Sequence, residues 1–291
     1  MQKVVIIGGD SYVAGGLEKY LTDCHVTNLH FDNWRDNIKT LKDADCVVNF
    51  SIAPEFSKQD VMPDEVIDTQ IAKTIRNTDT RFIFISSRKV YGSSNECVMY
   101  TEDDALNGVD FYAKNKIITE HKLNNILGDK LTVLRLSNIV GEPVNRTGYK
   151  TFIGWICENY INQGHLVVSQ NSRTVKDFVT KRFIHECLAE FIKKDTSGTY
   201  NLSAGFGMTI GDILNGYLGK SNVKYIGEDE PLFDQFVLDN SKLTATINKK
   251  ITREEISEYL QDCRKQLHSL KNNDGCKVEY IQRFMKAKDA Y

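Results

Sequence analysis

The chain begins with a run of β-branched residues, from Val4 to Ile7, that ends directly in Gly8 and Gly9. A run that is apolar at every position is typical of a strand buried on both faces of a parallel sheet. Similar short runs recur along the chain and alternate with segments of helical composition. This alternation predicts an α/β protein with a doubly wound parallel sheet and right-handed crossovers. The expected strands span residues 3–8, 28–31, 46–50, 82–86, 131–136 and 199–202, and the expected helices among them span residues 17–21, 64–76, 112–127 and 183–193.

The pattern is looser after Gly141. Residues 142–148 have the composition of a loop, and helices are expected at residues 151–162 and near residues 210–218. An acidic loop at residues 228–230 precedes a helical region that begins at about Thr252. These later segments predict a smaller lobe over the ends of the strands. We therefore expect a larger domain over residues 1–140, to which the chain returns at about residues 177–203, and a lobe formed mainly by residues 141–291.

Composition narrows the possible partners. Of the 291 residues, 41% are hydrophobic and 26% are charged, and the formal net charge is −2. These values give no reason to expect nucleic acid or an anionic membrane as a partner. The apolar runs are too short to span a bilayer and the N-terminus lacks the features of a signal peptide, which predicts a cytoplasmic protein. The seven cysteines and six histidines lack metal-ligand spacing, so no metal site is expected.

A glycine-rich turn runs from Gly8 to Gly15, directly after the first strand. Glycines at a strand-to-helix junction let the backbone turn sharply and approach a pyrophosphate group at the helix N-terminus. The match to the dinucleotide-binding pattern is incomplete, because Ser11 and Ala14 stand at its second and third glycine positions. Such turns also occur without a ligand, but the position at the first βα junction favours nucleotide binding. The candidate cofactor contacts in this turn are Gly8, Ser11, Tyr12 and Val13.

Asp32 lies at the end of the second expected strand. A carboxylate at this place accepts hydrogen bonds from the ribose diol of an adenosine, and it would repel a 2′-phosphate. NAD(H) is therefore the preferred cofactor. NADP(H) stays possible because Arg35 is close enough in sequence to hold a phosphate. Asp32 is also explained without a ligand, as a surface residue in a turn.

Tyr112 and Lys116 are four residues apart in an expected helix, so they share one face of it. A phenol ionises at about pH 10, and a neighbouring ammonium group lowers that pKa toward the range of proton transfer. In a chain with thirteen tyrosines this spacing also arises by chance. Ser86 and Ser87 end another buried strand, at the edge where open α/β sheets bind ligands. The Ser87 hydroxyl is a candidate to hold a substrate oxygen that Tyr112 protonates, although two serines can also simply cap a strand.

Together these motifs resemble those of the extended short-chain dehydrogenase/reductase family, the NAD-dependent epimerases, dehydratases and reductases of nucleotide sugars. Residues 86–92 are similar to the serine element of the family, which places its catalytic hydroxyl on Ser87. The spacings of 25 residues from Ser87 to Tyr112 and of 24 residues from Gly8 to Asp32 also resemble the family. The resemblance implies a Rossmann fold with a smaller C-terminal substrate lobe, and a homodimer formed through the helix that bears Tyr112.

Later segments continue the resemblance. Residues 134–141 are similar to a family segment whose asparagine, here Asn138, contacts the substrate diphosphate. Residues 176–184 resemble a second segment, in which Lys176 replaces an arginine that commonly binds the diphosphate. Residues 200–207 and 236–242 resemble two further family segments. The resemblance also implies backbone contacts from Phe50 and Ser51 to the dinucleotide, and a contact from Lys116 to the nicotinamide ribose.

Departures from the family pattern narrow the expected reaction. The 4,6-dehydratases carry an acidic pair directly after the catalytic hydroxyl, where this chain has Arg88 and Lys89, so the elimination of water lacks its acid and base. The ring-inverting cysteine of GDP-fucose synthase is also absent at Lys89. A second diphosphate-binding arginine is missing near Asp229, and Lys176 lacks the bidentate fork of an arginine. The diphosphate is therefore held more weakly or by other residues.

By elimination, we expect an NAD(P)H-dependent reductase that transfers a hydride to C4 of a nucleotide-linked 4-keto-6-deoxysugar. Ser87 would orient the carbonyl, Tyr112 would donate the proton and Lys116 would tune Tyr112. The first alternative is a nucleotide-sugar 4-epimerase with retained NAD, which uses the same three residues. The second is a non-catalytic, nicotinamide-sensing protein, although such proteins usually lose the tyrosine or the lysine. The expected partner is a small-molecule nucleotide sugar, with no nucleic acid and no membrane.

Overall fold

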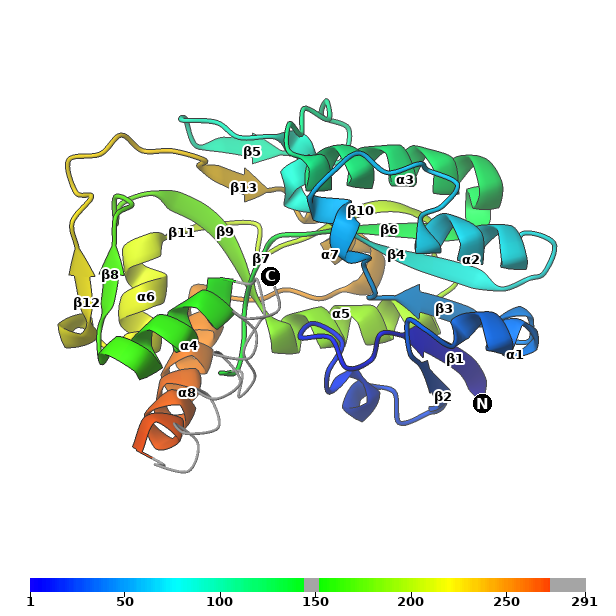
Figure 1. Cartoon of the computed structure of the whole chain (residues 1–291), viewed down its shortest axis with the longest axis horizontal. Coiled ribbons are helices and arrows are strands. Elements are labelled where there is room, and N and C mark those ends of the chain that lie inside the picture. Colours follow the sequence, from blue (N-terminus) through cyan, green and yellow to red (C-terminus); the bar gives the residue numbers. More distant parts are fainter. Residues whose placement is uncertain (144–151, 273–291) are drawn as a thin grey trace.

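The computed structural model describes residues 1–143 and 152–272. Most of the expected loop at residues 142–148 and the first residue of the helix expected at 151–162 lie outside the described residues. The centre of the fold is a six-stranded parallel sheet with the order β10-β6-β4-β3-β1-β2 (Figure 1). Its strands are β1 (Gln2–Ile7), β2 (Cys24–Leu29), β3 (Cys46–Asn49), β4 (Arg81–Ser87), β6 (Leu131–Leu136) and β10 (Gly198–Leu202). The strand order reverses between β1 and β3, which confirms the predicted doubly wound sheet.

Helices cover both faces of this sheet, as alternate residues of β1 show. Val5 and Ile7 belong to one hydrophobic cluster, which includes α1 (Ile38–Lys42), α2 (Ile67–Ile75) and α3 (Phe111–Leu127). Val4 and Ile6 belong to another cluster, which includes α5 (Lys181–Lys193). A strand that packs helices on both faces needs apolar residues at every position, which explains the run from Val4 to Ile7.

Two elements near the N-terminus differ from the sequence prediction. β2 begins at Cys24 rather than at residue 28, because it is an edge strand in which polar residues such as Thr27 interrupt the apolar pattern. The helix expected at residues 17–21 is only a short 3-10 helix, η1 (Leu17–Tyr20). β2 ends at Leu29, so Asp32 lies three residues beyond the end of its strand. Because η1 is short, no long helix follows the glycine turn.

A smaller lobe lies beside the main sheet (Figure 1). Its sheet has the order β11-β9-β13-β5, with β7 paired to β9, and β8 and β12 form a separate parallel pair. β5 follows β4 in the chain but pairs with β13, so the lobe combines segments that are far apart in sequence. The lobe strands are β5 (Val98–Tyr100), β7 (Asn138–Val140), β8 (Leu166–Val168), β9 (Val175–Thr180), β11 (Gly207–Thr209), β12 (Val223–Tyr225) and β13 (Phe236–Leu238), and the later helices are α4 (Phe152–Gln163), α6 (Ile210–Leu218), α7 (Ser241–Ile247) and α8 (Arg253–Asn272). A domain boundary at residue 140 stays a prediction.

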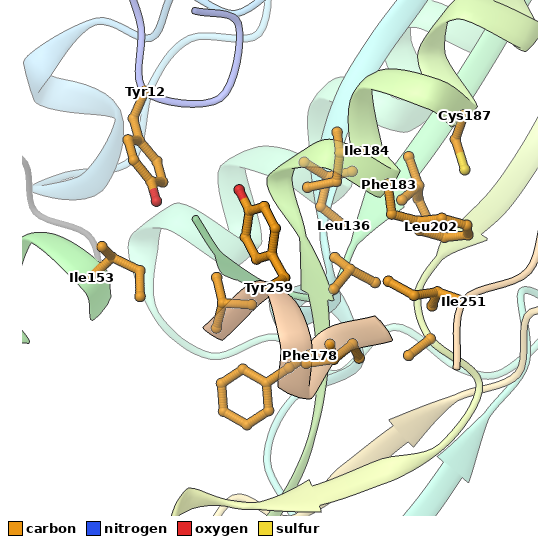
Figure 2. Packing of buried hydrophobic residues seen from close by; sticks show 14 of the residues in the cluster. Tyr12, Leu136, Ile153, Phe178, Phe183, Ile184, Cys187, Leu202, Ile251 and Tyr259 are labelled. Atoms are coloured by element: carbon orange, nitrogen blue, oxygen red, sulfur yellow. The ribbon is translucent and has the colours of Figure 1, made fainter. Parts of the chain in front are cut away.

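One hydrophobic core joins the sheet to the lobe (Figure 2). Leu136 of β6 and Leu202 of β10 pack in it together with residues of α5 and α8. At its edge, the Tyr259 hydroxyl of α8 donates a hydrogen bond of 2.7 Å to Glu142 Oε1. The Tyr12 hydroxyl lies 3.4 Å from the carbonyl oxygen of the same residue. The glycine turn and α8 therefore meet at Glu142.

Two global features bear on function. Within residues 1–143 and 152–272, no helix combines the length and the apolar character that a bilayer crossing requires. In those same ranges, no group of histidine, cysteine or acidic side chains has the arrangement of a metal site.

Candidate active site

A cavity of about 300 Å³ lies at the carboxyl ends of β1, β3 and β4, where the strand order reverses. Open α/β sheets bind ligands at this position. The glycine turn, the ends of β3 and β4, and the first turns of α3 all contribute to its wall. The predicted site residues in this wall are Ser11, Tyr12, Val13, Phe50, Ser51, Ser87, Tyr112 and Lys116. The fold therefore brings most of the predicted site together.

Gly8 begins the turn with a backbone φ of +76°, a conformation that favours glycine. A Cβ atom at this position would collide with the Ser51 hydroxyl and would lie 3.0 Å from the Ser51 nitrogen. Further along the turn, the Ser11 hydroxyl accepts a hydrogen bond of 3.2 Å from the Ala14 nitrogen. Only the short helix η1 follows. The helix dipole that usually stabilises a bound pyrophosphate is therefore small.

The turn is held from the side of α5 and the smaller lobe. The Tyr12 ring is 7% exposed and packs against Gly141. The Val13 carbonyl accepts a hydrogen bond of 2.7 Å from His185 Nε2 in α5. The Lys181 ammonium lies 5.2 Å from the centre of the Tyr12 ring. The Tyr12 side chain is thus committed to the packing of the turn, which leaves its backbone as the part suited to a cofactor contact.

A second cavity, of about 340 Å³, adjoins the first, and the two share Ile52 and Asp68. Arg35 lines this second cavity, and its guanidinium donates a hydrogen bond of 2.6 Å to Gln70 Oε1. Asp32 is exposed in the turn that precedes Arg35. Asp32, which is predicted to bind the ribose diol, and Arg35, which could bind a 2′-phosphate instead, therefore lie at the same end of the site.

Ser87 ends β4, Tyr112 lies in the first turn of α3, and a hydrogen bond joins their hydroxyl groups. The helix begins here because Asp110 caps it: its Oδ1 accepts a hydrogen bond of 2.7 Å from the Ala113 nitrogen. On the outer side, the Lys89 ammonium pairs with Asp110 Oδ2 at 2.8 Å and lies 5.9 Å from the centre of the Tyr112 ring. The local structure of the helix start thus places the phenol against the serine.

The pKa of the Tyr112 phenol is raised to about 12, because burial disfavours the phenolate more than the hydrogen bond with Ser87 favours it. The negative charges of Asp110 and Asp68 act in the same direction as burial. The net shift is therefore upward, so the expected net lowering of this pKa is wrong for this structure: burial outweighs any effect of the Lys116 charge. The lysine nitrogen lies 5.7 Å from the centre of the Tyr112 ring and donates a hydrogen bond to a different group.

That different group is the Ile85 carbonyl, which Lys116 Nζ reaches at 2.7 Å. The Lys116 side chain is buried, and its ammonium lies 4.4 Å from the centre of the Phe84 ring, within the range of a cation–π interaction. Burial lowers the pKa of Lys116, and the negative charges of Asp68 and Glu120 oppose that effect. Lys116 therefore occupies an apolar position with two carboxylates nearby.

Asp68 is a residue of the cavity wall that the sequence analysis did not identify. It lies in the first turn of α2, is 3% exposed, and accepts a hydrogen bond of 2.7 Å from Asn49 Nδ2. Asn49 Oδ1 in turn accepts a hydrogen bond of 2.9 Å from the Ser51 nitrogen. A signal was present in the sequence, because Asp68 occupies a helical position that shares its face with the buried residues Ala72 and Ile75. An aspartate on such a face is unusual unless it is paired.

A second network of buried polar groups supports the end of β4. The Ser86 hydroxyl donates a hydrogen bond to Glu120, and Glu120 Oε2 pairs with Arg135 Nη2 at 2.8 Å. Arg135 also donates a hydrogen bond of 2.9 Å to the Tyr91 hydroxyl. This network links β4, α3 and β6. Ser86 is thereby bonded within the scaffold, whereas Ser87 is bonded to Tyr112.

The two residues predicted to hold a substrate diphosphate lie in strands of the smaller lobe. Asn138 begins β7, directly after Ser137, which lines the cavity. Lys176 lies in β9, and its ammonium pairs with Asp234 Oδ2 at 2.7 Å. Arg88 binds the same carboxylate. The Asp234 carboxylate therefore offsets the positive charge of Lys176, which was predicted to hold the diphosphate.

The residues of the two cavities fit a nicotinamide dinucleotide. The first cavity combines the glycine turn with Ser87, Tyr112 and Lys116, and the adjoining cavity reaches Arg35 beside Asp32. One end of a dinucleotide would lie at Tyr112 and Lys116 and the other end at the turn after β2. Gly8 supports this fit, since only a residue without Cβ allows the close approach of β1 and β3 at this place.

Comparison with known proteins gives a family. The sequence model of the NAD dependent epimerase/dehydratase family matches residues 2–202. This match spans more than half of the chain and includes the glycine turn, both serines, Tyr112, Lys116 and Asn138. No curated protein matches the chain in sequence.

Several solved structures are similar to this fold. UDP-N-acetylglucosamine 4-epimerase from Methanobrevibacter ruminantium M1, in complex with UDP-N-acetylmuramic acid, superposes with a TM-score of 0.76 and 21% identity, over 92% of this chain and 98% of that chain. The dTDP-glucose 4,6-dehydratase from Bacillus anthracis str. Ames, in complex with NAD, gives a TM-score of 0.72 and 13% identity, over 92% and 97% of the two chains. RMD from Pseudomonas aeruginosa, complexed with NADPH, gives a TM-score of 0.68 and 18% identity, over 92% and 98%. At these identities the likeness shows the fold, which agrees with the predicted Rossmann fold and C-terminal lobe.

Proposed function

Because this chain belongs to the NAD-dependent epimerase/dehydratase family, we propose that it is an NADH-dependent reductase of a nucleotide-linked 4-keto-6-deoxysugar. The observation that carries the proposal is the state of Tyr112. Its phenol is half-buried, protonated at neutral pH and hydrogen-bonded to Ser87 at the cavity where the strand order reverses. A reduction requires a proton donor at this place, whereas a reaction that begins with oxidation requires a base.

Each residue of the site has a defined task in the proposed reaction. The bound nicotinamide supplies the hydride. Ser87 donates a hydrogen bond to the C4 carbonyl oxygen and orients it, and Tyr112 protonates that oxygen as it gains negative charge. A phenol with a pKa of about 12 is a stronger acid than the alcohol that forms, so this proton transfer is favourable. Lys116 contributes a positive charge that stabilises the phenolate left behind.

The glycine turn supports an exchangeable cofactor, which a reductase needs at every turnover. Ser11 and Ala14 stand where glycines would allow the closest approach of a pyrophosphate. The short helix η1 contributes little dipole to its binding. We propose NAD(H) as the preferred cofactor because Asp32 would repel a 2′-phosphate, with NADP(H) as the alternative through Arg35.

The proposed substrate is an anionic nucleotide sugar. Asn138 and Lys176 would hold its diphosphate, since Asn138 directly follows Ser137 of the cavity wall and β9, the strand of Lys176, pairs with the strand of Asn138. Lys176 would then share its charge between Asp234 and the substrate. The proposed weak hold on the diphosphate predicts a dependence of KM on ionic strength.

The test of this proposal uses UDP-, dTDP- and GDP-linked 4-keto-6-deoxyhexoses as substrates with added NADH. We expect protein that purifies largely free of cofactor. We also expect a loss of reduced-nicotinamide absorbance in proportion to the sugar reduced. Stoichiometric bound NAD, with interconversion of nucleotide sugars and no net loss of NADH, would instead assign the 4-epimerase reaction.

We also propose that the protein forms a homodimer through α3, the helix that bears Tyr112. Phe111 and Ile118 of this helix are large apolar residues with exposed fractions of 42% and 41%. Apolar side chains exposed on one helix are suited to burial against a second copy. Sedimentation velocity should give a dimer, and the double change of Phe111→Ser and Ile118→Ser should give a monomer.

A further inference from the structure

Asp68 is a buried carboxylate that the proposed reaction does not use. Its position at the boundary of the two cavities places it between Lys116 and the predicted adenosine end of the site. A carboxylate loses its hydration on burial, so a buried aspartate requires hydrogen bonds or a nearby cation. The hydrogen bond from Asn49 supplies the first, at 2.7 Å. The nearby cation has to come from the groups that surround the cavity.

The charged groups around Lys116 identify this cation. Helix α3 contributes Glu120, but that carboxylate is already paired with Arg135 of β6 at 2.8 Å. Helix α2 contributes Asp68, which lines the same cavity as Lys116 and is in no ion pair within 4.0 Å among the residues that the structure describes. The other groups packed around the ammonium are uncharged: the rings of Phe84 and Phe56, the Ile85 carbonyl and the neutral phenol of Tyr112.

We propose that Asp68 is a positioning residue for Lys116: its carboxylate holds the lysine as an ammonium ion beside Tyr112, and Asn49 fixes the carboxylate in place. This inference rests on the proposed proton-transfer role of Lys116 and deepens it. The neutral amine of a deprotonated lysine would not stabilise the phenolate that forms when Tyr112 donates its proton.

The electrostatics of the pair support this assignment. Burial lowers the pKa of Lys116 and raises the pKa of Asp68, so burial alone would neutralise both groups. The charge of each residue opposes the effect of burial on the other. When the charge of Asp68 is removed, only Glu120 still opposes the lowering of the Lys116 pKa by burial. Arg135 already neutralises Glu120. The ammonium form should then disappear at a lower pH.

The decisive variant is Asp68→Asn, which removes the charge but keeps the size of the side chain and an oxygen to accept the hydrogen bond from Asn49. The pKa of Lys116 is measured from the ¹³Cε chemical shift in protein labelled at lysine, with the resonance assigned by its loss in Lys116→Met. We expect the pKa of Lys116 to fall by about one unit or more relative to the unaltered protein. A pKa within the experimental error of the unaltered value would overturn the proposal.

Asp64→Asn is the matched control. Asp64 lies just before α2 and is paired with Lys73 at 2.8 Å and with Lys122 at 2.9 Å, on the exposed side of α2 and α3. Removing its charge should leave the pKa of Lys116 unchanged, because both of its partners face solvent. An equal shift in Asp64→Asn and Asp68→Asn would show a general effect of net charge and would also overturn the proposal.

The reciprocal experiment does not depend on the folding of Asp68→Asn. If the two charges stabilise each other, Lys116→Met should raise the pKa of the Asp68 carboxyl by a similar amount, because an interaction between two groups is shared by both. The carboxyl ¹³C resonance of Asp68 reports this shift. An unchanged Asp68 titration in Lys116→Met would contradict the proposal.

These titrations need no substrate, so they separate this inference from the proposed function. A shifted Lys116 pKa in a protein that reduces no keto sugar would retain the role of Asp68 and reject the reductase. An unshifted pKa in a protein whose turnover depends on Tyr112 would retain the reductase and reject the role of Asp68. Where both hold, the alkaline limb of kcat in Asp68→Asn should move to lower pH by the measured shift, with little change in KM for the sugar.

Discussion

The two terminal nitrogens of Arg88 each donate one hydrogen bond to a different carboxylate oxygen of Asp234, and both bonds are 2.6 Å long. Lys176 reaches the same carboxylate at 2.7 Å, so two cations converge on one anion. Burial alone would raise the pKa of Asp234, but the bonds to Arg88 and Lys176 outweigh it and lower the pKa. Arg88 directly follows Ser87, and Asp234 lies in the segment that leads into β13. The cluster therefore ties the end of β4 to the smaller lobe next to the candidate site.

The first prediction concerns this cluster. Asp234→Asn should lower the free energy of unfolding by about 3 kcal/mol, because two mostly buried cations lose their carboxylate. Asp234 has a left-handed backbone, with φ of 55°, which asparagine adopts equally well, so the change tests the charge rather than the backbone. Urea denaturation gives the measurement. Asp229→Asn, at an exposed position of the preceding loop, should change stability by less than about 0.5 kcal/mol.

The sequence predicted the central sheet well because a strand buried on both faces is apolar at every position. The expected strand at residues 131–136 coincides with β6, and that at residues 46–50 differs from β3 by one residue. β2 was misplaced because an edge strand needs no continuous apolar run. The pairing of β5 with β13 was not predicted, since each has only three residues and their partners are distant in the chain.

The site was predictable where a motif carries its own geometry. The prediction that Ser87, Tyr112 and Lys116 lie together agrees with their place in one cavity wall, because helical spacing and a strand end fix their relative positions. Asp68 and the partners of Lys176 were not found, because their roles depend on contacts between segments that are distant in sequence. The error about the pKa of Tyr112 has the same origin. Spacing places a lysine one turn away, but it does not show that burial dominates the phenol.

The second prediction concerns the proton donor. Tyr112→Phe keeps the ring but removes the transferable proton, so turnover should fall by at least about a hundredfold. The affinity for NADH should change little, since the glycine turn and Lys116 are intact. Steady-state kinetics and a fluorescence titration with NADH test both parts. Tyr225→Phe, on the lobe strand β12, is the control and should keep normal turnover. Normal turnover in Tyr112→Phe would reject the assignment.

The third prediction concerns pH. The pKa of Tyr112 is raised to about 12, so the phenol should stay protonated throughout the neutral range and lose its proton only in strong alkali. The difference in phenolate absorbance between the unaltered protein and Tyr112→Phe should therefore rise near pH 12. Because the ordinary pKa of a tyrosine is lower, the contribution of this group to stability is present below about pH 10 and is lost as the pH rises to 12. A step in the difference absorbance below pH 9 would contradict the proposed role as a neutral donor.

The fourth prediction concerns the choice of cofactor. NADH should bind more tightly than NADPH, and Asp32→Ala should reduce or reverse that preference, because the repulsion of a 2′-phosphate is lost. Arg35→Ala should weaken NADPH more than NADH. Fluorescence titrations of each protein with both reduced cofactors give these affinities. Asp36→Ala, at a neighbouring exposed position, should leave the preference intact. Tighter binding of NADPH by the unaltered protein would show that Arg35 outweighs Asp32.

The fifth prediction separates two reasons for a glycine at position 8. Gly8 and Gly128 both have positive φ, at +76° and +53°, so alanine strains the backbone at either position. A Cβ atom at Gly128 meets nothing within 4 Å, whereas one at Gly8 would lie 3.0 Å from the backbone nitrogen of Ser51. Gly8→Ala should therefore destabilise the protein clearly more than Gly128→Ala in urea denaturation.

The same comparison tests the cofactor site, because Ser51 cannot move without displacing the wall of the cavity that carries Asn49 and Phe50. We expect Gly8→Ala to weaken NADH binding at least about tenfold in a fluorescence titration, since the backbone of the turn is displaced from its binding position. Gly128→Ala, at the far end of α3, should bind NADH normally. Equal loss of stability and unchanged NADH affinity in the two variants would mean that Gly8 serves only its own backbone conformation, and that the dinucleotide does not depend on this turn.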